Sequence, residues 1–381
     1  MRLISVWIVL ILGSSCGLSE TEDYNSNYKI ESYNLIIDSL ATFDFELFQI
    51  VRDGNDEYLY VLNKHNKTID IYDIEKGKIR KRVNLVKDVR YSGLSKNYFY
   101  VINPDSILLI PAYTLRGTVL IDSNGNVRHR YNPALPVDVE FPNLINHSSN
   151  PSRPNYYRNG KLFLAHLTLR NTTFLKYSES KTYTDIVFDM EVDSVYFNEK
   201  MTYPSEYVNN SYITLHAVNY RVLTKSNKWV YSWPVLNELL IYDSTYNLIN
   251  KTNAGSRYFS GLSPVIERFP VEKYLEYYIS NTSYSRIIED HIRNRYYRFV
   301  MRGRSGFNYE SDLNMSSEDK NEFSIMVFDE NFNLIDEYDF LGKTYNIYGA
   351  FVGERGLFIP KNNYYNEYVS EDTLKYDIIN F

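Results

Sequence analysis

The amino-acid sequence predicts an all-β fold, a six-bladed β-propeller formed by residues 29–381 as a single domain. Helical periodicity is scarce, whereas alternating apolar and aromatic segments of about five to eight residues recur between turn signals. The 38 tyrosines also favour half-buried strands, because aromatic side chains pack well on a pleated surface. A repeated turn phrase and the two ends of the chain predict that these strands form a closed ring.

The turn phrase recurs at a spacing that suits propeller blades. An apolar strand ends in Asp, and Gly, Asn or Asp follows four residues later, as in IDIYDIEKG at Asp73. Asp accepts backbone N–H groups at the start of a turn, and we expect the fourth residue after it to take a positive φ. The further copies lie at Asp122, Asp189, Asp243, Asp329 and Asp377. Their separations of 49, 67, 54, 86 and 48 residues fit blades of about 40 to 50 residues with loop insertions.

The two ends of the chain predict how the ring closes. The last copy of the phrase runs into Phe381 with no outer strand after it, while the strand-like segment 29–39 stands alone before the first repeat. We expect that segment to complete the last blade, which removes the exposed edges of an open stack. A β-sandwich or two smaller β domains are the structural alternatives.

The composition excludes some classes of protein. The chain is 44% hydrophobic and 23% charged, with a formal net charge of −6. A disordered chain would be less hydrophobic, and a nucleic-acid-binding chain would be basic. We therefore expect a folded protein with no nucleic-acid partner.

The N-terminal segment predicts a bacterial lipoprotein leader. An apolar run over 3–12 leads through small residues at 13–15 to Cys16, the only cysteine of the chain. The run is shorter than a membrane span and has the size of a signal-peptide core. It resembles a lipobox, although Leu12 lies four residues before the cysteine instead of three. We expect residues 1–15 to be removed and Cys16 to be acylated; an ordinary secretory signal is the alternative.

Residues 16–28 predict an acidic tether between the lipid and the folded domain. Glu20, Glu22 and Asp23 follow the cysteine, in a pattern similar to the surface-export signal of Bacteroidota lipoproteins. We expect a cell-envelope protein whose lipid binds the outer membrane, on its periplasmic or its surface side.

The leader, the length, the richness in Tyr and Asn and the repeated YD hairpins together resemble one known family. They are similar to Bacteroidota six-bladed propeller lipoproteins of the domain of unknown function numbered 4221. The resemblance extends over nearly the whole mature chain and implies the propeller architecture. It implies no activity, because its motifs are structural.

Two similar loops are the first candidate ligand-binding site. VRYSGLS carries Arg90 and Tyr91, and SRYFSGLS carries Arg257 and Tyr258. They lead into the second and fifth repeats, which face each other across a six-fold ring, so both pairs are expected at one mouth of the axis. Arg offers a planar donor fork for anions, and Tyr stacks on sugar or aromatic rings. The alternative is that both pairs only pack between blades.

The proline-rich stretch 132–159 is the second candidate surface. It contains five prolines together with Arg153, Tyr157 and Arg158. Proline keeps such a segment out of a sheet, and long ordered loops often carry binding groups. The alternative is a flap that only covers the fold. A shorter insertion at 264–281 is expected to include a short helix over one face.

Recognisable catalytic and metal-binding patterns are missing from the sequence. The six histidines are scattered and show no metal-ligand spacing, so we expect no metal and no cofactor. DSNGN and DGNDE superficially resemble calcium loops but are better explained as hairpin turns. The G-x-S-x-G elbow, phosphate-binding glycine loops and dinucleotide fingerprints are also missing.

These observations favour a lipid-anchored module that binds a ligand or another protein at one mouth of the ring. The expected partners are an envelope protein, a polar small molecule or a glycan. An enzyme, such as a hydrolase or lyase acting on a glycan or lactone, is the alternative, and it rests on fold analogy alone. A purely structural subunit of an envelope complex is a third possibility.

Overall fold

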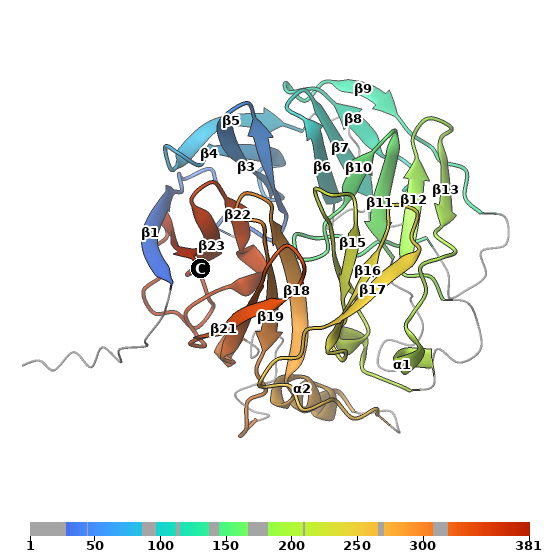
Figure 1. Cartoon of the computed structure of the whole chain (residues 1–381). Helices are drawn as coiled ribbons and strands as arrows, with labels where there is room; N and C mark the ends of the chain where they lie inside the picture. Colours follow the sequence, from blue (N-terminus) through green and yellow to red (C-terminus); the bar gives the residue numbers. More distant parts are fainter. Residues whose placement is uncertain are drawn as a thin grey trace, which may run out of the picture.

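The computed structural model is a ring of six four-stranded antiparallel sheets (Figure 1). It describes residues 28–43, 45–85, 97–111, 115–136, 145–166, 182–208, 210–265, 270–307 and 319–381. The predicted six-bladed propeller is confirmed. Every blade has four strands, and in five of the six blades these strands are consecutive in the chain.

Each of the first five blades takes its strands in chain order. Blade 1 contains β2 (Phe48–Asp53), β3 (Asp56–Asn63), β4 (Thr68–Asp73) and β5 (Lys78–Asn84). Blade 2 contains β6 (Asn97–Asn103), β7 (Ser106–Pro111), β8 (Val119–Ile121) and β9 (Val127–Arg130). Blade 3 contains β10 (Tyr156–Arg158), β11 (Lys161–Ala165), β12 (Asp185–Asp189) and β13 (Ser194–Phe197). Blade 4 contains β14 (Tyr220–Leu223), β15 (Trp229–Ser232), β16 (Glu238–Tyr242) and β17 (Leu248–Asn253). Blade 5 contains β18 (Ser283–Asp290), β19 (Arg295–Met301), β20 (Phe323–Phe328) and β21 (Leu334–Phe340).

Blade 6 joins the two ends of the chain. It contains β22 (Phe351–Gly353), β23 (Gly356–Pro360), β24 (Thr373–Asn380) and, as its outer strand, β1 (Lys29–Ile36). The antiparallel register runs from Lys29 opposite Asn380 to Ile36 opposite Thr373. The predicted closure of the ring by the first strand is therefore confirmed.

The first strand of each blade, which is β22 in blade 6, lies innermost. Contacts between blades join β2 to β6, β14 to β18 and β18 to β22, while the outer strands β1 and β5 contact each other at the rim. Apolar side chains pack between neighbouring blades; one such cluster, for example, joins Tyr60 and Leu62 of blade 1 to Ile107 and Leu109 of blade 2.

The strand directions give the ring two unlike faces. At one face, short hairpin turns join the first strand of a blade to the second and the third to the fourth; we call it the short-turn face. The other connections, including the described parts of 131–155 and 254–282, lie at the opposite end of the strands, which we call the long-loop face. Helices α1 (Ser205–Val208) and α2 (Val271–Ser280) belong to long-loop segments, and α2 agrees with the predicted short helix (Figure 1).

The Asp-bearing turns follow the expectation only in part. A positive φ falls on the fourth residue at Gly77 and Asp193, as expected. The expectation is wrong for the copies at Asp122, Asp243 and Asp329, where the third residue takes the positive φ. These residues are Gly125, Tyr246 and Phe332. In these three copies the fourth residue is Asn, and its backbone and side chain both donate to the Asp carboxylate.

The sixth copy is not a turn. Asp377 lies inside β24, opposite Ser32 of β1, and not at the end of its strand. Its carboxylate accepts a hydrogen bond from the Tyr345 hydroxyl at 2.7 Å and forms an ion pair with Lys361 at 3.2 Å. The sequence resemblance of this copy to the others therefore does not extend to its structural role.

Candidate functional site

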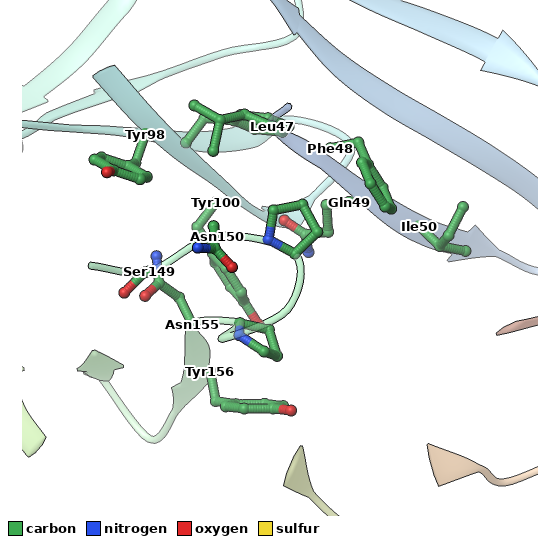
Figure 2. A pocket seen from close by; sticks show the side chains of 13 residues that line it. Leu47, Phe48, Gln49, Ile50, Tyr98, Tyr100, Ser149, Asn150, Asn155 and Tyr156 are labelled. Atoms are coloured by element: carbon green, nitrogen blue, oxygen red, sulfur yellow. The ribbon is translucent and has the colours of Figure 1, made fainter. Parts of the chain in front are cut away.

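A pocket of about 240 Å³ lies between the first three blades (Figure 2). Its walls come from the starts of the inner strands β2 and β6 and from the segment that leads into β10, so it lies toward the long-loop face. The lining residues are Leu47, Phe48, Gln49, Ile50, Tyr98, Phe99, Tyr100, Ser149, Asn150, Pro151, Pro154, Asn155 and Tyr156. None of these described lining residues carries a charge.

Gln49 fixes the distance between two walls of the pocket. Its Nε2 donates to the Val101 carbonyl at 3.0 Å, and its Oε1 accepts from the Val101 backbone N–H at 2.8 Å. This pair of bonds ties β2 to β6 across the gap between blades 1 and 2. Both halves of the Gln49 amide are thereby engaged by the protein.

The third wall is a loop held by its own side chains. Asn150 Oδ1 accepts from the backbone N–H groups of Ser152 at 2.9 Å and Arg153 at 3.0 Å, which closes a tight turn. The Arg153 guanidinium is buried, and its Nε donates to the Asn219 carbonyl at 2.8 Å. Burial lowers the pKa of Arg153 to about 10. The loop is thus anchored to blade 4.

Two buried polar atoms beside the pocket have no hydrogen-bond partner among the described residues. They are Oγ of Ser149, a residue that is 1% exposed, and Oδ1 of Asn155, a residue that is 8% exposed. A buried polar atom without a partner costs free energy, and native proteins rarely leave one in that state. Both residues line the pocket, so a bound molecule that supplies hydrogen-bond donors would satisfy them.

Tyr100 of β6 adds a hydroxyl group to the pocket. Its oxygen accepts from the Tyr157 backbone N–H at 3.1 Å. Burial raises the pKa of this hydroxyl, so it stays protonated at neutral pH. With the rings of Phe48, Tyr98 and Tyr156, the pocket offers aromatic faces together with hydroxyl and amide groups.

The structure brings two of the three predicted residues of the proline-rich stretch, Arg153 and Tyr157, close to this pocket. Arg153 belongs to the loop wall and Tyr157 donates its backbone N–H to Tyr100, although neither side chain lines the pocket. Arg158 ends β10 at the short-turn face. Ligand binding by these three residues remains a prediction.

Arg257 and Tyr258 lie elsewhere, against the outer strand of blade 5. Arg257 Nη2 and the Tyr258 hydroxyl both bind Asp339 Oδ2 of β21, each at 2.8 Å. The Arg302 guanidinium lies 4.1 Å from the centre of the Tyr258 ring. The expected counterparts Arg90 and Tyr91 lie outside the described residues, as does Cys16.

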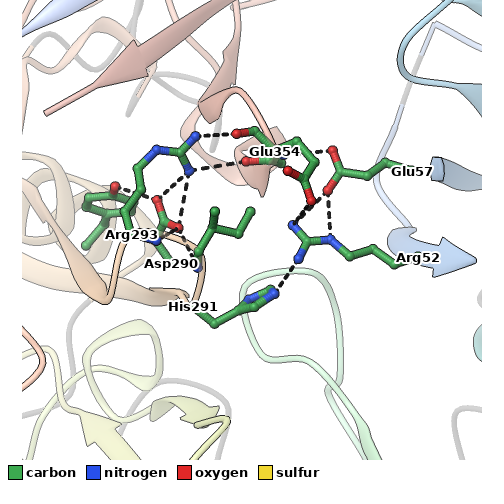
Figure 3. Close-up of polar contacts among 9 residues, drawn as sticks. Arg52, Glu57, Asp290, His291, Arg293 and Glu354 are labelled. Carbon is green, nitrogen blue, oxygen red and sulfur yellow. Dashed lines mark hydrogen bonds and ion pairs between the residues drawn. The ribbon is translucent and has the colours of Figure 1, made fainter. Parts of the chain in front are cut away.

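A second polar cluster lies at the short-turn face (Figure 3). Arg52 of blade 1 contacts Nε2 of His291 from blade 5 and forms an ion pair with Glu57 at 2.8 Å. Glu57 also accepts from the backbone N–H of Glu354 in blade 6, at 2.8 Å. Burial and the Arg52 charge lower the pKa of His291. The cluster joins three blades, and its charges are already paired.

Two features are missing from the described residues, a cluster of metal-binding side chains and a membrane-spanning helix. In this part of the chain, no group of three or more His, Cys, Asp or Glu side chains is arranged to hold a metal ion. Within the same residues, no helix is both long and apolar enough to cross a membrane.

Comparison with known families decides the relationship of the chain. The family model described as "Domain of unknown function (DUF4221)" matches residues 27–339. The chain belongs to the DUF4221 family. A comparison with curated proteins gives no match.

Solved structures share the fold of this DUF4221 chain. A DUF4221 member from Bacteroides vulgatus ATCC 8482 is 22% identical, with a TM-score of 0.75 over 93% of this chain and 98% of the other. A "Putative exported protein" from Bacteroides fragilis NCTC 9343 is 11% identical, with a TM-score of 0.50 over 93% of this chain and 95% of the other. At these identities the likeness concerns the fold alone.

Sequence reasoning missed most of the pocket. Gln49, Tyr98 and Tyr100 lie on strands with ordinary alternating patterns, and only the ring closure brings them beside Ser149 and Asn155. The one usable signal was the proline-rich stretch, which supplies the third wall.

Proposed function

We propose that this protein is a ligand-binding module of the bacterial cell envelope and that its pocket between blades 1, 2 and 3 takes one ring of a hydroxyl-rich ligand such as a sugar. The observation that carries this proposal is the pair of unpartnered buried oxygens, on Ser149 and Asn155, beside an aromatic pocket. Sugar hydroxyls supply the donors that these acceptors lack.

The size and lining of the pocket support a small ligand. Its volume of about 240 Å³ lies below the range of roughly 300–1,000 Å³ that is usual for drug-sized ligands, so it suits a single ring. Phe48, Tyr98 and Tyr156 offer rings on which the apolar face of a sugar packs. The described lining holds no carboxylate or imidazole to act as an acid or base, so the pocket favours binding over the alternative of a hydrolase or lyase.

The test of binding uses titration calorimetry with free hexoses and N-acetylhexosamines. Asn155→Leu and Ser149→Ala remove the unpartnered acceptors without removing a hydrogen bond within the protein. Each is expected to weaken sugar binding about tenfold to a hundredfold, as the loss of a buried hydrogen bond of about 1–3 kcal/mol implies.

The matched control is Asn55→Leu, which changes the same residue type in an exposed turn of the short-turn face. It should leave sugar binding unchanged. Failure of every sugar to bind the wild-type protein would refute the proposal, as would equal binding by the Asn155 and Asn55 variants.

The envelope location rests on the leader and on Cys16. The name of the exported Bacteroides fragilis protein with the same fold supports export of this chain as well. Acylation of Cys16 would hold the domain at the outer membrane through its 16–28 tether. Cells given labelled palmitate should incorporate the label into the wild-type protein and not into Cys16→Ser; label in the mutant would exclude this anchor.

A further inference from the structure

Buried positive charge surrounds the loop wall of the pocket. Arg153 belongs to that wall, and Arg286 extends from β18 of blade 5 to donate to the carbonyl of the lining residue Pro151, at 3.1 Å. Arg153 is 4% exposed and Arg286 is 3% exposed. Both guanidinium groups are therefore buried within or behind the loop wall, and neither side chain lines the cavity.

These two guanidinium groups have no carboxylate partner among the described residues. Arg286 Nη1 donates to the carbonyls of Ile347 at 2.8 Å and Tyr348 at 3.1 Å, and its buried Nε has no partner. Arg153 bonds to Asn219, Ser148 and the His166 carbonyl, which are all uncharged groups. These uncharged oxygens satisfy part of the hydrogen-bonding capacity of the two guanidinium groups, but they do not neutralise the positive charges.

The nearest other charges do not cancel this excess. A third buried guanidinium, that of Arg221, is paired with Asp185. Glu289, farther along β18, accepts from the Lys225 backbone N–H at 3.0 Å. One carboxylate does not offset two guanidinium groups, so the balance of buried charge behind the wall is positive.

Both guanidinium groups lie next to the lining of the cavity. Arg286 bonds to the carbonyl of the lining residue Pro151, and Arg153 belongs to the same loop, between the lining residues Pro151 and Pro154. A low-dielectric wall screens such charges weakly, so a cavity with an uncharged lining acquires a positive potential. A buried unpaired charge is also costly, and an anion brought near it lowers that cost.

We infer that the pocket prefers a sugar ring that carries a carboxylate, that is, a uronic acid, over its neutral counterpart. This inference rests on the proposed function and narrows its ligand class. The carboxylate would accept hydrogen bonds from pocket groups and gain from the field of Arg286 and Arg153 without touching either. Arg286 is thus a positioning residue for the wall and a source of selectivity.

The experiment compares matched pairs of free sugars, glucose with glucuronate and galactose with galacturonate, by titration calorimetry at neutral pH. The quantity of interest is the ratio of the neutral to the acidic dissociation constant. In the wild-type protein, the acidic member of at least one pair is expected to bind about tenfold more tightly.

Three variants separate charge from structural support. Arg286→Gln should reduce the ratio to near one, whereas Arg286→Lys keeps the charge and should keep most of the preference. The matched control is Arg298→Gln, because Arg298 is equally buried and binds only uncharged groups, including the Ala254 and Leu236 carbonyls, away from the pocket lining. It should leave the ratio unchanged.

The outcomes distinguish this inference from the proposed function. Equal binding of neutral and acidic sugars by the wild-type protein overturns the inference and leaves the proposed function standing, and it requires no variant to fold. A loss of affinity in Arg286→Gln that is equal for both sugars, with the ratio kept, also overturns it, since that result assigns Arg286 a structural role only. Failure of these four sugars and of the N-acetylhexosamines to bind contradicts the proposed function itself.

Discussion

At the scale of single residues, the interior holds histidines in their neutral form. His216 is fully buried beside the rings of Tyr277 and Tyr278, and neither of its ring nitrogens has a hydrogen-bond partner within the described part of the chain. Burial lowers the pKa of His216 to about 3, against 6.5 for a free histidine. Since the unfolded chain binds the proton first, this residue contributes full stability only above about pH 6.5 and loses it as the pH falls.

The corresponding prediction concerns His216→Phe. At pH 4 the wild-type protein should have lost roughly 3 kcal/mol of unfolding free energy through this histidine, at about 1.4 kcal/mol per pH unit. The variant keeps an aromatic ring in an apolar site. Its unfolding free energy should therefore fall by roughly 3 kcal/mol less than that of the wild type between pH 7 and pH 4. Urea unfolding at both pH values measures the difference.

The control is His65→Phe, which changes an exposed turn residue of blade 1. Its unfolding free energy should depend on pH as that of the wild type does. An unchanged pH dependence in His216→Phe would show that the acid sensitivity lies elsewhere, for example at the buried His147, whose pKa burial lowers to about 4.

At the scale of elements, one turn is built in two ways, with glycine or with a buried aromatic residue at the position of positive φ. Gly125 takes its positive φ where a Cβ would lie 2.2 Å from the Asn84 carbonyl oxygen. Tyr246 and Phe332 take the same conformation with large side chains. The Tyr246 ring stacks on Trp229 with 5.3 Å between the ring centres, and the Phe332 ring stacks on Tyr296 with 4.5 Å between them. A left-handed residue costs about 1–2 kcal/mol, and burial of an aromatic side chain offsets this with about 1.5–3 kcal/mol.

These turns show which features of the fold could be predicted from the sequence and which could not. The Asp at the turn start and the strand before it are local features, so five blades were predictable from their turns. The sixth blade was predicted from Asp377, which lies inside a strand, and the closing strand was predictable from the two ends of the chain. The residue with positive φ was not, because tertiary stacking at Tyr246 overrides the local preference for glycine. The pocket was less predictable still, since Gln49 and Asn155 meet only through the arrangement of blades 1 and 3.

At the scale of the whole molecule, one strand closes the ring. β1 covers the edge of β24 along its full length, and its Tyr33 and Leu35 enter the core beside Phe358 and Tyr376. The ring centres of Tyr28 and the C-terminal Phe381 lie 5.5 Å apart at the short-turn face. The described chain therefore begins at the face opposite the long loops and the pocket.

The closure predicts the effect of two truncations. Deletion of residues 1–36 removes β1 and should lower the unfolding free energy by roughly 4 kcal/mol, the contribution expected from burying Tyr33 and Leu35, a large share of the 5–15 kcal/mol that is typical of a domain. The bare edge of β24 should also promote association. Deletion of residues 1–27 keeps β1 and should change neither property, as urea unfolding and light scattering would show.

A synthetic peptide of residues 28–37, added to the shorter protein, should restore the monomer and its stability if edge pairing is the cause. Equal stability of the two truncated proteins would contradict the prediction, because it would mean that the other five blades hold the ring without β1.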